Sequence, residues 1–405
     1  MRVIVVGGGI GGVSAALGLK RAGVEHLVLE QAPRFEEVGA GLQLSPNAVR
    51  ILEWLGLEDA LKTFCVEPAA HLFKDWKTGE ILLRTPLMPK VRETFGAPYY
   101  HSHRADLLDA LVQELSLEHV RFDAKVIAVS QDEGGVRVEL ADGSVEAADV
   151  LIAADGIHSV VREQSFRPDP PRASGCVAWR ALVPAGVARD LGFERNSYIW
   201  MGPERSVVLY YVSGERLFNW VGIGPLQRGA RESWSAEGAV ETVLEEFTGW
   251  HEQIRKLIAA TDGLFVTALH DRDPLPRWTE GRIALLGDAA HAMLPFHAQG
   301  AVQSIEDAWV LARCIEGGAS DIPSALRRYE ALRMDRANRV QEQSRAGEHL
   351  LHMSDPDEIA RRNARFRDNE GRYADSFPPG QRWLFAYDAE KAVRGEDAAW
   401  RATSW

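Results

Sequence analysis

The sequence has few cysteines, no long apolar run and no excess of positive charge. Its three cysteines, Cys65, Cys176 and Cys314, are odd in number and far apart, which argues against a disulfide framework and for a reducing cytoplasm. They lack the spacing of a zinc site, so we expect no metal. No apolar run reaches the about 18 residues that a membrane span requires. The segment Met1–Val6 is too short for a signal peptide, and glycines follow it at once.

The charge balance excludes two classes of partner. The chain of 405 residues has 46 basic and 58 acidic residues and a net charge of −12, so it offers no general attraction to nucleic acid or to an anionic membrane. A hydrophobic content of 46% is ordinary for a globular protein. The length allows two or three domains, and we expect a monomer or homodimer that binds small molecules.

The strongest motif lies at the start of the chain. A short apolar run predicts a strand buried on both faces, and Gly7, Gly9 and Gly12 follow in G-x-G-x-x-G spacing. An amphipathic helix and a second strand come next, and that strand ends at Glu30. The first glycine allows a tight turn, the second lets the backbone approach a pyrophosphate, and the third lets helix and strand pack closely. An ordinary glycine-rich turn is the alternative, but the complete order of elements favours a dinucleotide site at the helix N-terminus.

Glu30 bears on which dinucleotide binds. A carboxylate at this place accepts hydrogen bonds from ribose hydroxyls and repels a 2′-phosphate, so FAD and NAD both fit and NADP does not. No second G-x-G-x-x-G and no C-x-x-C pair follow in the chain. Reductases with two nucleotide folds and a redox pair of cysteines are therefore disfavoured.

The remaining pattern predicts further strands and helices. Residues 70–100 are predicted to form strands, and residues 119–155 a hairpin followed by a strand. Residues 172–265 predict an aromatic-rich antiparallel sheet that ends in one helical piece, Gly238–Ala259. Residues 322–352 predict a long amphipathic helix whose many arginines face solvent. The aromatic stretch Trp383–Tyr387 is expected to pack back on the body.

Two more apolar strands end in an aspartate. Asp155-Gly156 follows residues 150–154, and Gly287-Asp288 follows residues 283–286 and precedes a long helix. Ligands of α/β sheets collect at the carboxyl ends of strands, so both aspartates are candidates for ligand binding. The alternative for Asp288 is a helix N-cap.

Together the three motifs resemble those of the single-component FAD-dependent aromatic hydroxylases. Over about residues 1–390 the chain is most similar to the salicylate, 3-hydroxybenzoate and 6-hydroxynicotinate hydroxylase branch, and Gly281–Ala308 is the most specific block. The resemblance implies an α/β fold: a Rossmann-like FAD-binding domain, an inserted antiparallel-sheet substrate domain and a helical C-terminal region. The implied boundaries are 1–70, 101–171 and 266–320 for the FAD domain, 71–100 and 172–265 for the substrate domain, and 321–405 for the helical region.

The resemblance also assigns cofactor contacts. It implies that the three glycines hold the FAD pyrophosphate and Glu30 the adenosine ribose. Asp288 would bond a ribityl hydroxyl, Asp155 would serve FAD and the transient binding of NADH or NADPH, and the loop Gly39–Leu42 would pass close to the flavin ring. The implied FAD contacts are Gly7, Gly9, Gly12, Glu30, Gly41, Leu42, Arg104, Val126 (near the adenine), Asp155, Asp288, Gly300 and Ala301.

The implied activity is NAD(P)H-consuming hydroxylation of a phenolic or N-heteroaromatic molecule through a flavin hydroperoxide formed with dioxygen. The candidates for activating the ring hydroxyl are Tyr210, His297 and Gln299, and Arg84 or Arg180 could pair with a substrate carboxylate. A tailoring epoxidase or hydroxylase of a larger aromatic metabolite, and an FAD oxidase or dehydrogenase without nicotinamide, are the alternatives.

The sequence departs from the family pattern at two places. Many relatives have Gly-Gln-Gly-Ala where this chain begins with Ala298. Some relatives carry a substrate-facing histidine four residues before a tyrosine on an inner strand, and the matching positions here are Ser206 and Tyr210. His297 is the residue that could supply a polar group near the ring instead, and an ordinary loop histidine is the alternative.

Overall fold

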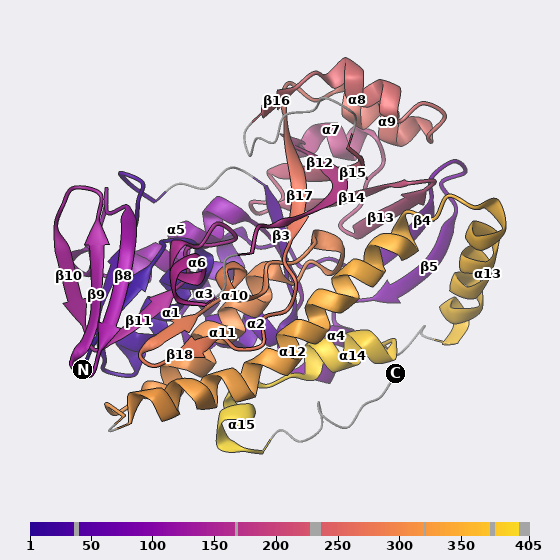
Figure 1. The fold of residues 1–405 in the computed structure, drawn as a ribbon. Helices are drawn as coiled ribbons and strands as arrows, with labels where there is room; N and C mark the ends of the chain where they lie inside the picture. Colours follow the sequence, from indigo (N-terminus) through magenta and orange to yellow (C-terminus); the bar gives the residue numbers. More distant parts are fainter. Residues whose placement is uncertain (36–39, 167–168, 227–235, 320, 373–376, 397–405) are drawn as a thin grey trace.

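The structure is a computed structural model that describes residues 1–35, 40–166, 169–226, 236–319, 321–372 and 377–396. Two main sheets lie next to each other, and the long helix α12 (Ile322–Leu351) runs along both of them (Figure 1). No helix in the described ranges combines the length and the apolarity needed to cross a membrane. The α/β fold with a helical C-terminal region that the sequence predicted is confirmed.

The first sheet has six strands in the order β18-β19-β11-β1-β2-β7. The strands are β1 (Arg2–Val6), β2 (Glu25–Leu29), β7 (Val120–Arg121), β11 (Val150–Ala153), β18 (Thr279–Glu280) and β19 (Ile283–Leu285). All pairs are parallel except β18 with β19. The central strands β1 and β11 are apolar apart from Arg2, because all their other side chains are buried. The carboxyl ends of β1, β11 and β19 therefore meet at one edge.

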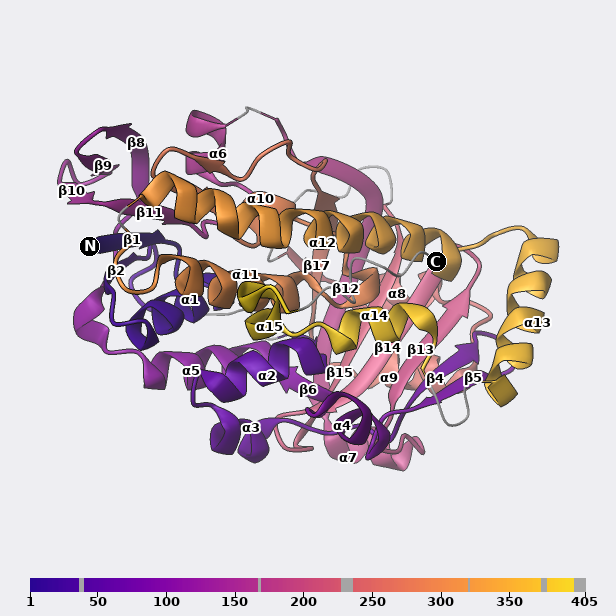
Figure 2. The same ribbon diagram turned by 90° about the horizontal axis from the view of Figure 1, so that it is seen from below.

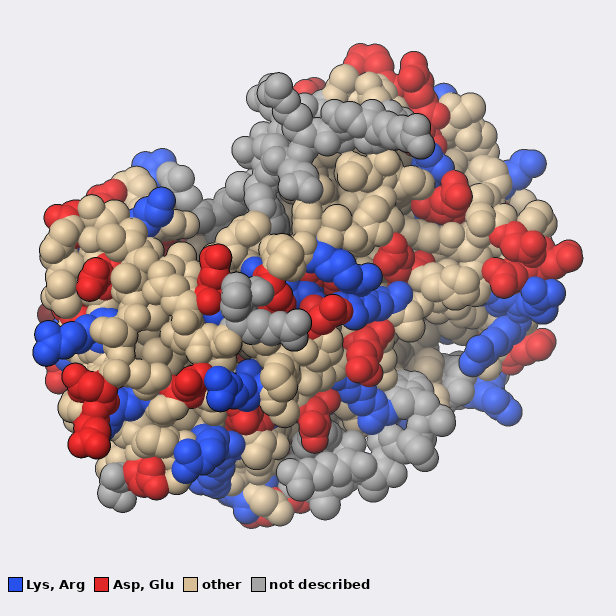
Figure 3. Space-filling model, viewed as in Figure 1, with Lys and Arg blue, Asp and Glu red and all other residues tan. Residues whose placement is uncertain are grey.

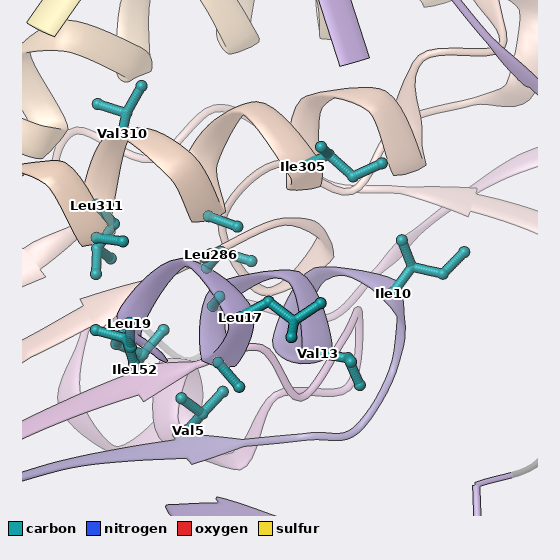
Figure 4. Close-up of a cluster of buried hydrophobic side chains, with 14 of the residues drawn as sticks. Val5, Ile10, Val13, Leu17, Leu19, Ile152, Leu286, Ile305, Val310 and Leu311 are labelled. Atoms are coloured by element: carbon teal, nitrogen blue, oxygen red, sulfur yellow. The ribbon is translucent and has the colours of Figure 1, made fainter. Parts of the chain in front are cut away.

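Two helices form the core beside this sheet. In α1 (Ile10–Arg21) and α11 (Gly300–Ile315), apolar side chains interlock with those of β1 and β11 (Figure 4). The helices approach so closely that a Cβ on Gly18 would lie 2.9 Å from that of Ala312. Segments almost 300 residues apart in sequence thus share one core.

Smaller sheets and helices complete this half of the molecule. The strands β8 (Val126–Asp132), β9 (Gly135–Leu140) and β10 (Val145–Ala148) form one small sheet, and β3 (Gly41–Leu44) with β6 (Tyr100–His103) another. The other helices before residue 300 are α2 (Pro46–Trp54), α3 (Glu58–Phe64), α4 (Lys90–Phe95), α5 (Arg104–Glu114), α6 (Val160–Ser165), α7 (Ala185–Asp190), α8 (Val240–Glu246), α9 (Glu252–Ala259) and α10 (Asp288–His291), with short 3-10 turns at Leu117–His119 and Pro295–His297.

The second main sheet has eight strands in the order β16-β17-β12-β15-β14-β13-β4-β5. They are β4 (Ala70–Asp75), β5 (Ile81–Pro86), β12 (Arg172–Pro184), β13 (Ser197–Gly202), β14 (Arg205–Val212), β15 (Leu217–Pro225), β16 (Ala236–Gly238) and β17 (Leu264–Asp271). All neighbours are antiparallel except β13 with β4. The predicted strands between residues 172 and 225 are confirmed.

Alternation along β14 explains how the sheet serves two purposes. Val207, Leu209 and Tyr211 pack into an aromatic core with α7, α8 and α9. Ser206 and Tyr210 face the other way and line a cavity. Successive side chains of a strand point to opposite faces, so one face builds the core and the other is free to hold a ligand.

Two helix predictions need correction. Residues 90–95, expected within a run of strands, form α4, which ends at Gly96 in the left-handed region (φ +78°). The single helical piece expected over residues 238–259 is two helices, α8 and α9, because Gly249 has a positive φ of 81° and His251 caps the second helix.

The C-terminal helices cover one side of the molecule, from α15 (Ala389–Arg394) beside α11 to α13 (Pro356–Arg372) beside β5 at the far edge of the eight-stranded sheet (Figures 1 and 2). After α12 come α13, α14 (Pro379–Ala386) and α15. The expected packing of the aromatic stretch is confirmed, since Trp383, Phe385 and Tyr387 are all buried.

Candidate active site

A cavity of about 1350 Å³ lies where the carboxyl edge of the six-stranded sheet meets the free face of the eight-stranded sheet. Its inner end is formed by Gly9, Gly156 and Asp288, and its roof by Arg180 and Tyr210. Helices α12, α13 and α14 form the remaining walls. The topology thus brings all three sequence motifs to one place, as ligand sites of α/β sheets require.

The three N-terminal glycines have three different geometries. Gly7 turns the chain after β1 with φ +101°, and a Cβ there would lie 2.4 Å from the carbonyl oxygen of Ala154. A Cβ on Gly12 would lie 1.9 Å from the carbonyl oxygen of Gly7, so helix and turn touch. A Cβ on Gly9 would meet nothing within 4 Å, because it would project into open space at the N-terminus of α1. That open space beside unpaired N–H groups fits the pyrophosphate of FAD.

Glu30 is held directly beside this turn. Its carboxylate accepts hydrogen bonds from the backbone N–H groups of Gly8 at 2.6 Å and Ala32 at 2.8 Å. Its carbonyl oxygen accepts a hydrogen bond from the N–H of Ala124 at 2.8 Å. This contact brings Val126, which is buried at the start of β8, to the same end of the site. The geometry fits the assignment of both residues to the adenosine end of FAD.

The second motif is divided between the cavity and the fold. Gly156 lines the cavity, but the Asp155 carboxylate accepts a hydrogen bond from the N–H of Val161 at 3.4 Å, at the start of α6. Burial raises the pKa of Asp155, and its Oδ1 has no hydrogen-bond partner among the described residues. Asp155 itself does not line the cavity, so this oxygen is a buried acceptor that lies behind the lining residues Ala154 and Gly156.

Arg162, seven residues after Asp155, stabilises the fold and does not line the cavity. It is buried, pairs with Asp169 at 2.7 Å and donates to the carbonyl oxygens of Ala289 and Ala290, each at 3.0 Å. Arg162 therefore ties the second motif to the third.

The third motif ends in two helix N-termini. Gly287 adopts φ +62°, and Asp288 begins α10 with its side chain exposed to the cavity. Gly300 and Ala301 begin α11, and a Cβ on Gly300 would lie 4.0 Å from Asp288 Oδ1. Gln299 is buried and donates to the Ser45 hydroxyl at 3.1 Å. The N–H groups of this turn can face a negatively charged ring edge.

The loop before β3 packs against the roof of the cavity. Gly41 donates its N–H to Asn219 Oδ1 at 2.8 Å, and a Cβ on Gly41 would lie 2.6 Å from the Tyr210 ring. Gly41, Leu42 and Arg104 line the cavity, and Gly39 lies outside the described residues. No larger residue fits at position 41 without moving Tyr210.

Of the two arginines suggested for a carboxylate, only one faces the cavity. Arg84 is exposed on β5, where its neighbours Leu83 and Thr85 point inward instead. The suggestion for Arg84 is therefore wrong, because strand alternation turns it away. Arg180 lines the cavity, and its charge acts on Tyr210.

Several polar residues in the cavity wall or directly behind it were missed: His71 lines the cavity, whereas His101 and His352 are not part of its lining. His71 is buried in the wall, and burial lowers its pKa to about 4. His101 stacks on Tyr210 with ring centroids 4.2 Å apart. The hydroxyl of Ser206, the position where some relatives are expected to carry a histidine, lies 2.9 Å from Nε2 of His352, which follows α12. Serine and histidine are 146 residues apart, so no local pattern could have paired them.

His297 and Ala298 form the turn between the third motif and α11. Burial lowers the pKa of His297, and its ring packs on Gly347, where a Cβ would lie 3.0 Å from the imidazole. Ala298 adopts the left-handed conformation, φ +52° and ψ +36°. The departure from the family's glycine therefore places a methyl group in a strained backbone.

Replacing Ala298 by glycine is expected to raise the free energy of unfolding by up to about 1 kcal/mol, because relief of the left-handed strain exceeds the extra chain entropy of glycine. Urea denaturation of the FAD-loaded protein measures this change. In the right-handed helix α13, the same change at the exposed Ala364 should cost about 1 kcal/mol. Equal losses at both positions would contradict the prediction.

A buried charged cluster lies between α11 and α12. Arg333 and Arg336 are fully buried, so the expectation that the arginines of this helix face solvent is wrong for these two. Arg333 Nε lies 2.8 Å from Asp307 Oδ1, and Arg336 Nε lies 2.8 Å from Glu306 Oε2. Asp307 also accepts from the N–H of Gly287 at 3.0 Å. The cluster thus holds the Gly287-Asp288 motif in place from the side that faces away from the cavity.

The carboxyl groups of the cluster are ionised. Burial alone would raise the pKa of Glu306, but the charges of Arg336 and Arg333 outweigh it and hold this pKa below its usual value. For Asp307, the charges of His291 and Arg333 outweigh burial in the same way. These groups are structural, since none of them lines the cavity.

Comparison with known proteins agrees with this geometry. The sequence profile of the FAD binding domain family matches residues 1–344. The chain is 37% identical to 3-amino-4-hydroxybenzoate 2-monooxygenase of Streptomyces cremeus, over 96% of both chains. It is 35% identical to 6-hydroxynicotinate 3-monooxygenase of Bordetella bronchiseptica, over 98% of both.

The fold also matches a solved structure with the cofactor bound. HpxO of Klebsiella pneumoniae, complexed with FAD and uric acid, superposes with a TM-score of 0.82 at 30% identity, over 98% of this chain and 95% of that one. The chain belongs to the FAD binding domain family and is an FAD-dependent monooxygenase of the aromatic hydroxylase group.

Proposed function

We propose that this enzyme hydroxylates a small phenolic or N-heteroaromatic ring that carries a carboxylate, with NADH or NADPH as reductant and dioxygen as oxidant. One observation carries the proposal. Arg180 lines the cavity, and its Nε donates a hydrogen bond to the Thr267 hydroxyl, with Nε 3.4 Å from Oγ1. Among the described residues it makes no ion pair. Burial lowers the pKa of Arg180, so its charge is poorly solvated and a ligand carboxylate would stabilise it.

The names of the relatives support this class of substrate. One relative is named for 3-amino-4-hydroxybenzoate and another for 6-hydroxynicotinate, both aromatic rings with a hydroxyl group and a carboxylate. The free face of the sheet suits such a ring, because Val208, Val221 and Ile223 line it next to Arg180. These apolar side chains exclude water from the reacting atoms.

Tyr210 and His297 are the groups we assign to the ring hydroxyl. Burial raises the pKa of Tyr210, so its phenol stays protonated and orients the ring by hydrogen bonding. Burial lowers the pKa of His297, so its imidazole is neutral at pH 7, and Nδ1 has no hydrogen-bond partner among the described residues. Nδ1 is buried against Gly347, but His297 lines the cavity, and we assign its neutral imidazole to accept the proton of the ring hydroxyl.

The remaining residues hold the cofactor. When bound, FAD supplies hydride acceptance from the nicotinamide nucleotide and activation of dioxygen. Asp288 would bond a ribityl hydroxyl, and Arg104 the ribityl or phosphate region. The N–H groups of Gly300 and Ala301 at the start of α11, kept in place by Gln299, would stabilise negative charge on the ring system. No second nucleotide-binding fold occurs in the sequence, so the reductant would bind transiently.

Oxidation of NADH and NADPH by the FAD-loaded protein tests the proposal. The panel is salicylate, 3- and 4-hydroxybenzoate, 6-hydroxynicotinate and 3-amino-4-hydroxybenzoate, each compared with the analogue that lacks the carboxylate. A true substrate speeds oxidation about 10-fold or more with little hydrogen peroxide, whereas its analogue without the carboxylate does not.

Three results would overturn parts of the proposal. Equal stimulation by the neutral analogues would exclude the carboxylate. Stimulation by larger aromatic molecules alone would favour a tailoring enzyme. Reduction of FAD by an amine or a hydroxy acid without nicotinamide would favour an oxidase.

A further inference from the structure

The outer wall of the cavity is built by α13, at the opposite end of the molecule from β1 (Figures 1 and 2). Several side chains of this helix line the cavity, namely Glu358, Arg361, Arg362, Arg365, Phe366 and Asn369. Arg361 and Arg365 are four positions apart, so they lie next to each other on one face of the helix. Phe366 anchors the helix, because its ring packs edge-on against Phe73 of β4 and belongs to a buried cluster with Leu83 of β5 and Met201 of β13.

The arginines of α13 differ in their partners. Arg362 is buried and donates to the carbonyl oxygen of Leu350 at 3.2 Å and to Asn363. Arg367 lies outside the cavity and pairs with Glu80 at 2.7 Å. Arg361 and Arg365 are exposed, and neither makes an ion pair or a hydrogen bond with any described residue. These two guanidinium groups are therefore available to a ligand.

This concentration of positive charge contrasts with the rest of the chain. The net charge is −12, yet Glu358 is the one acidic side chain that the described part of α13 contributes to the cavity. Figure 3 shows basic side chains gathered around α13, with acidic groups beside them. A cationic cavity mouth concentrates anionic ligands and raises their rate of association.

We propose that Arg361 and Arg365 form an anion subsite at the outer end of the cavity. It takes the phosphates of the nicotinamide nucleotide, or the carboxylate of the aromatic substrate as it enters. Two adjacent guanidinium groups offer the paired N–H donors that bind both kinds of anion. The subsite is separate from the place of the FAD pyrophosphate, which the Gly9 turn holds at the inner end. The inference rests on the proposed function, since it assigns where that function's anionic ligands enter.

The test compares three forms of the FAD-loaded protein. They are the unchanged enzyme, the double variant Arg361→Gln/Arg365→Gln and the matched control Arg367→Gln, which removes one charge from the same helix outside the cavity. Titration calorimetry with pyrophosphate and with benzoate measures binding directly. We expect the double variant to bind one or both probes about 10-fold more weakly in low salt, and the control to bind them as the unchanged enzyme does.

Steady-state kinetics identifies the source of the anion. A fall of about 10-fold in kcat/KM for NADH or NADPH, with kcat unchanged and the salt dependence reduced, assigns the subsite to the nucleotide. The same fall for the aromatic acid assigns it to the substrate. If the double variant retains less FAD, the single variants Arg361→Gln and Arg365→Gln replace it, and each should bind the probes more weakly than the control Arg367→Gln.

The outcomes separate this inference from the proposed function. Equal binding of both probes by the double variant and the control overturns the anion subsite, whatever the enzyme turns over. Loss of probe binding in a protein that hydroxylates none of the panel supports the subsite and counts against the proposed function alone.

Discussion

A Gly9→Val variant is expected to fold as well as the unchanged protein but to bind FAD about 100-fold more weakly. The backbone of Gly9 has φ −71° and ψ 179°, which any residue adopts, and a Cβ there meets no protein atom within 4 Å. The new side chain would fill the space that the pyrophosphate needs beside the N-terminus of α1. Absorbance of retained flavin and a titration of the apoprotein with FAD measure the effect.

Gly12→Ala is the matched control, because it acts on the fold instead of the ligand. Its Cβ would lie 1.9 Å from the carbonyl oxygen of Gly7, so backbone must move, at a cost of about 3 kcal/mol. Urea denaturation of the two apoproteins separates the effects. Normal FAD affinity in Gly9→Val would show that the pyrophosphate lies elsewhere.

Replacing Arg333 by methionine is expected to lower the free energy of unfolding by about 3–5 kcal/mol. The change removes one partner from each of two fully buried carboxylates, Glu306 and Asp307, and leaves Arg336 as the one buried arginine beside two negative charges, which is costly. Since Asp307 also holds the N–H of Gly287, FAD affinity should fall as well. Chemical denaturation with and without FAD measures both changes.

The matched control is Arg367→Met, which breaks an exposed ion pair and should cost at most about 1 kcal/mol. The pH dependence gives a second readout. The pKa values of Glu306 and Asp307 are lowered in the folded state. Their contribution to the free energy of unfolding is therefore complete above about pH 5 and is lost as the pH falls below about 4. A shallower acid dependence is expected in Arg333→Met, and an unchanged one would contradict the role of the cluster.

The sequence predicted the elements whose cause is local. The glycine spacing near Gly7 and the apolar runs of β1 and β11 depend on neighbours in the chain, and they predicted the turn and the sheet. The fold class followed from their order. The order of the elements also predicted that the motifs containing Asp155 and Asp288 meet at the carboxyl edge of the sheet.

The rest depends on partners far apart in the chain. Nothing near Arg333 reveals that Asp307, 26 residues earlier, would bury it. Ser206 and His352 meet only because α12 crosses the eight-stranded sheet. Arg84 was wrongly predicted to reach a substrate carboxylate. An alternating pattern shows that residues form a strand, but it does not show which face of the strand meets a cavity.

The central position of β1 also determines when the protein can mature during synthesis. The ribosome makes β1 well before its partners, because its neighbour β11 ends at residue 153, and α11, which packs on α1, ends at residue 315. At about 5–20 residues per second, the nascent chain waits about 15–60 s for that partner. A nascent chain that has not yet reached residue 315 contains the G-x-G-x-x-G motif but lacks the complete helix α11 that packs on α1. The support for the nucleotide motif is therefore complete only after α11 has been made, so cofactor loading has to wait for this helix.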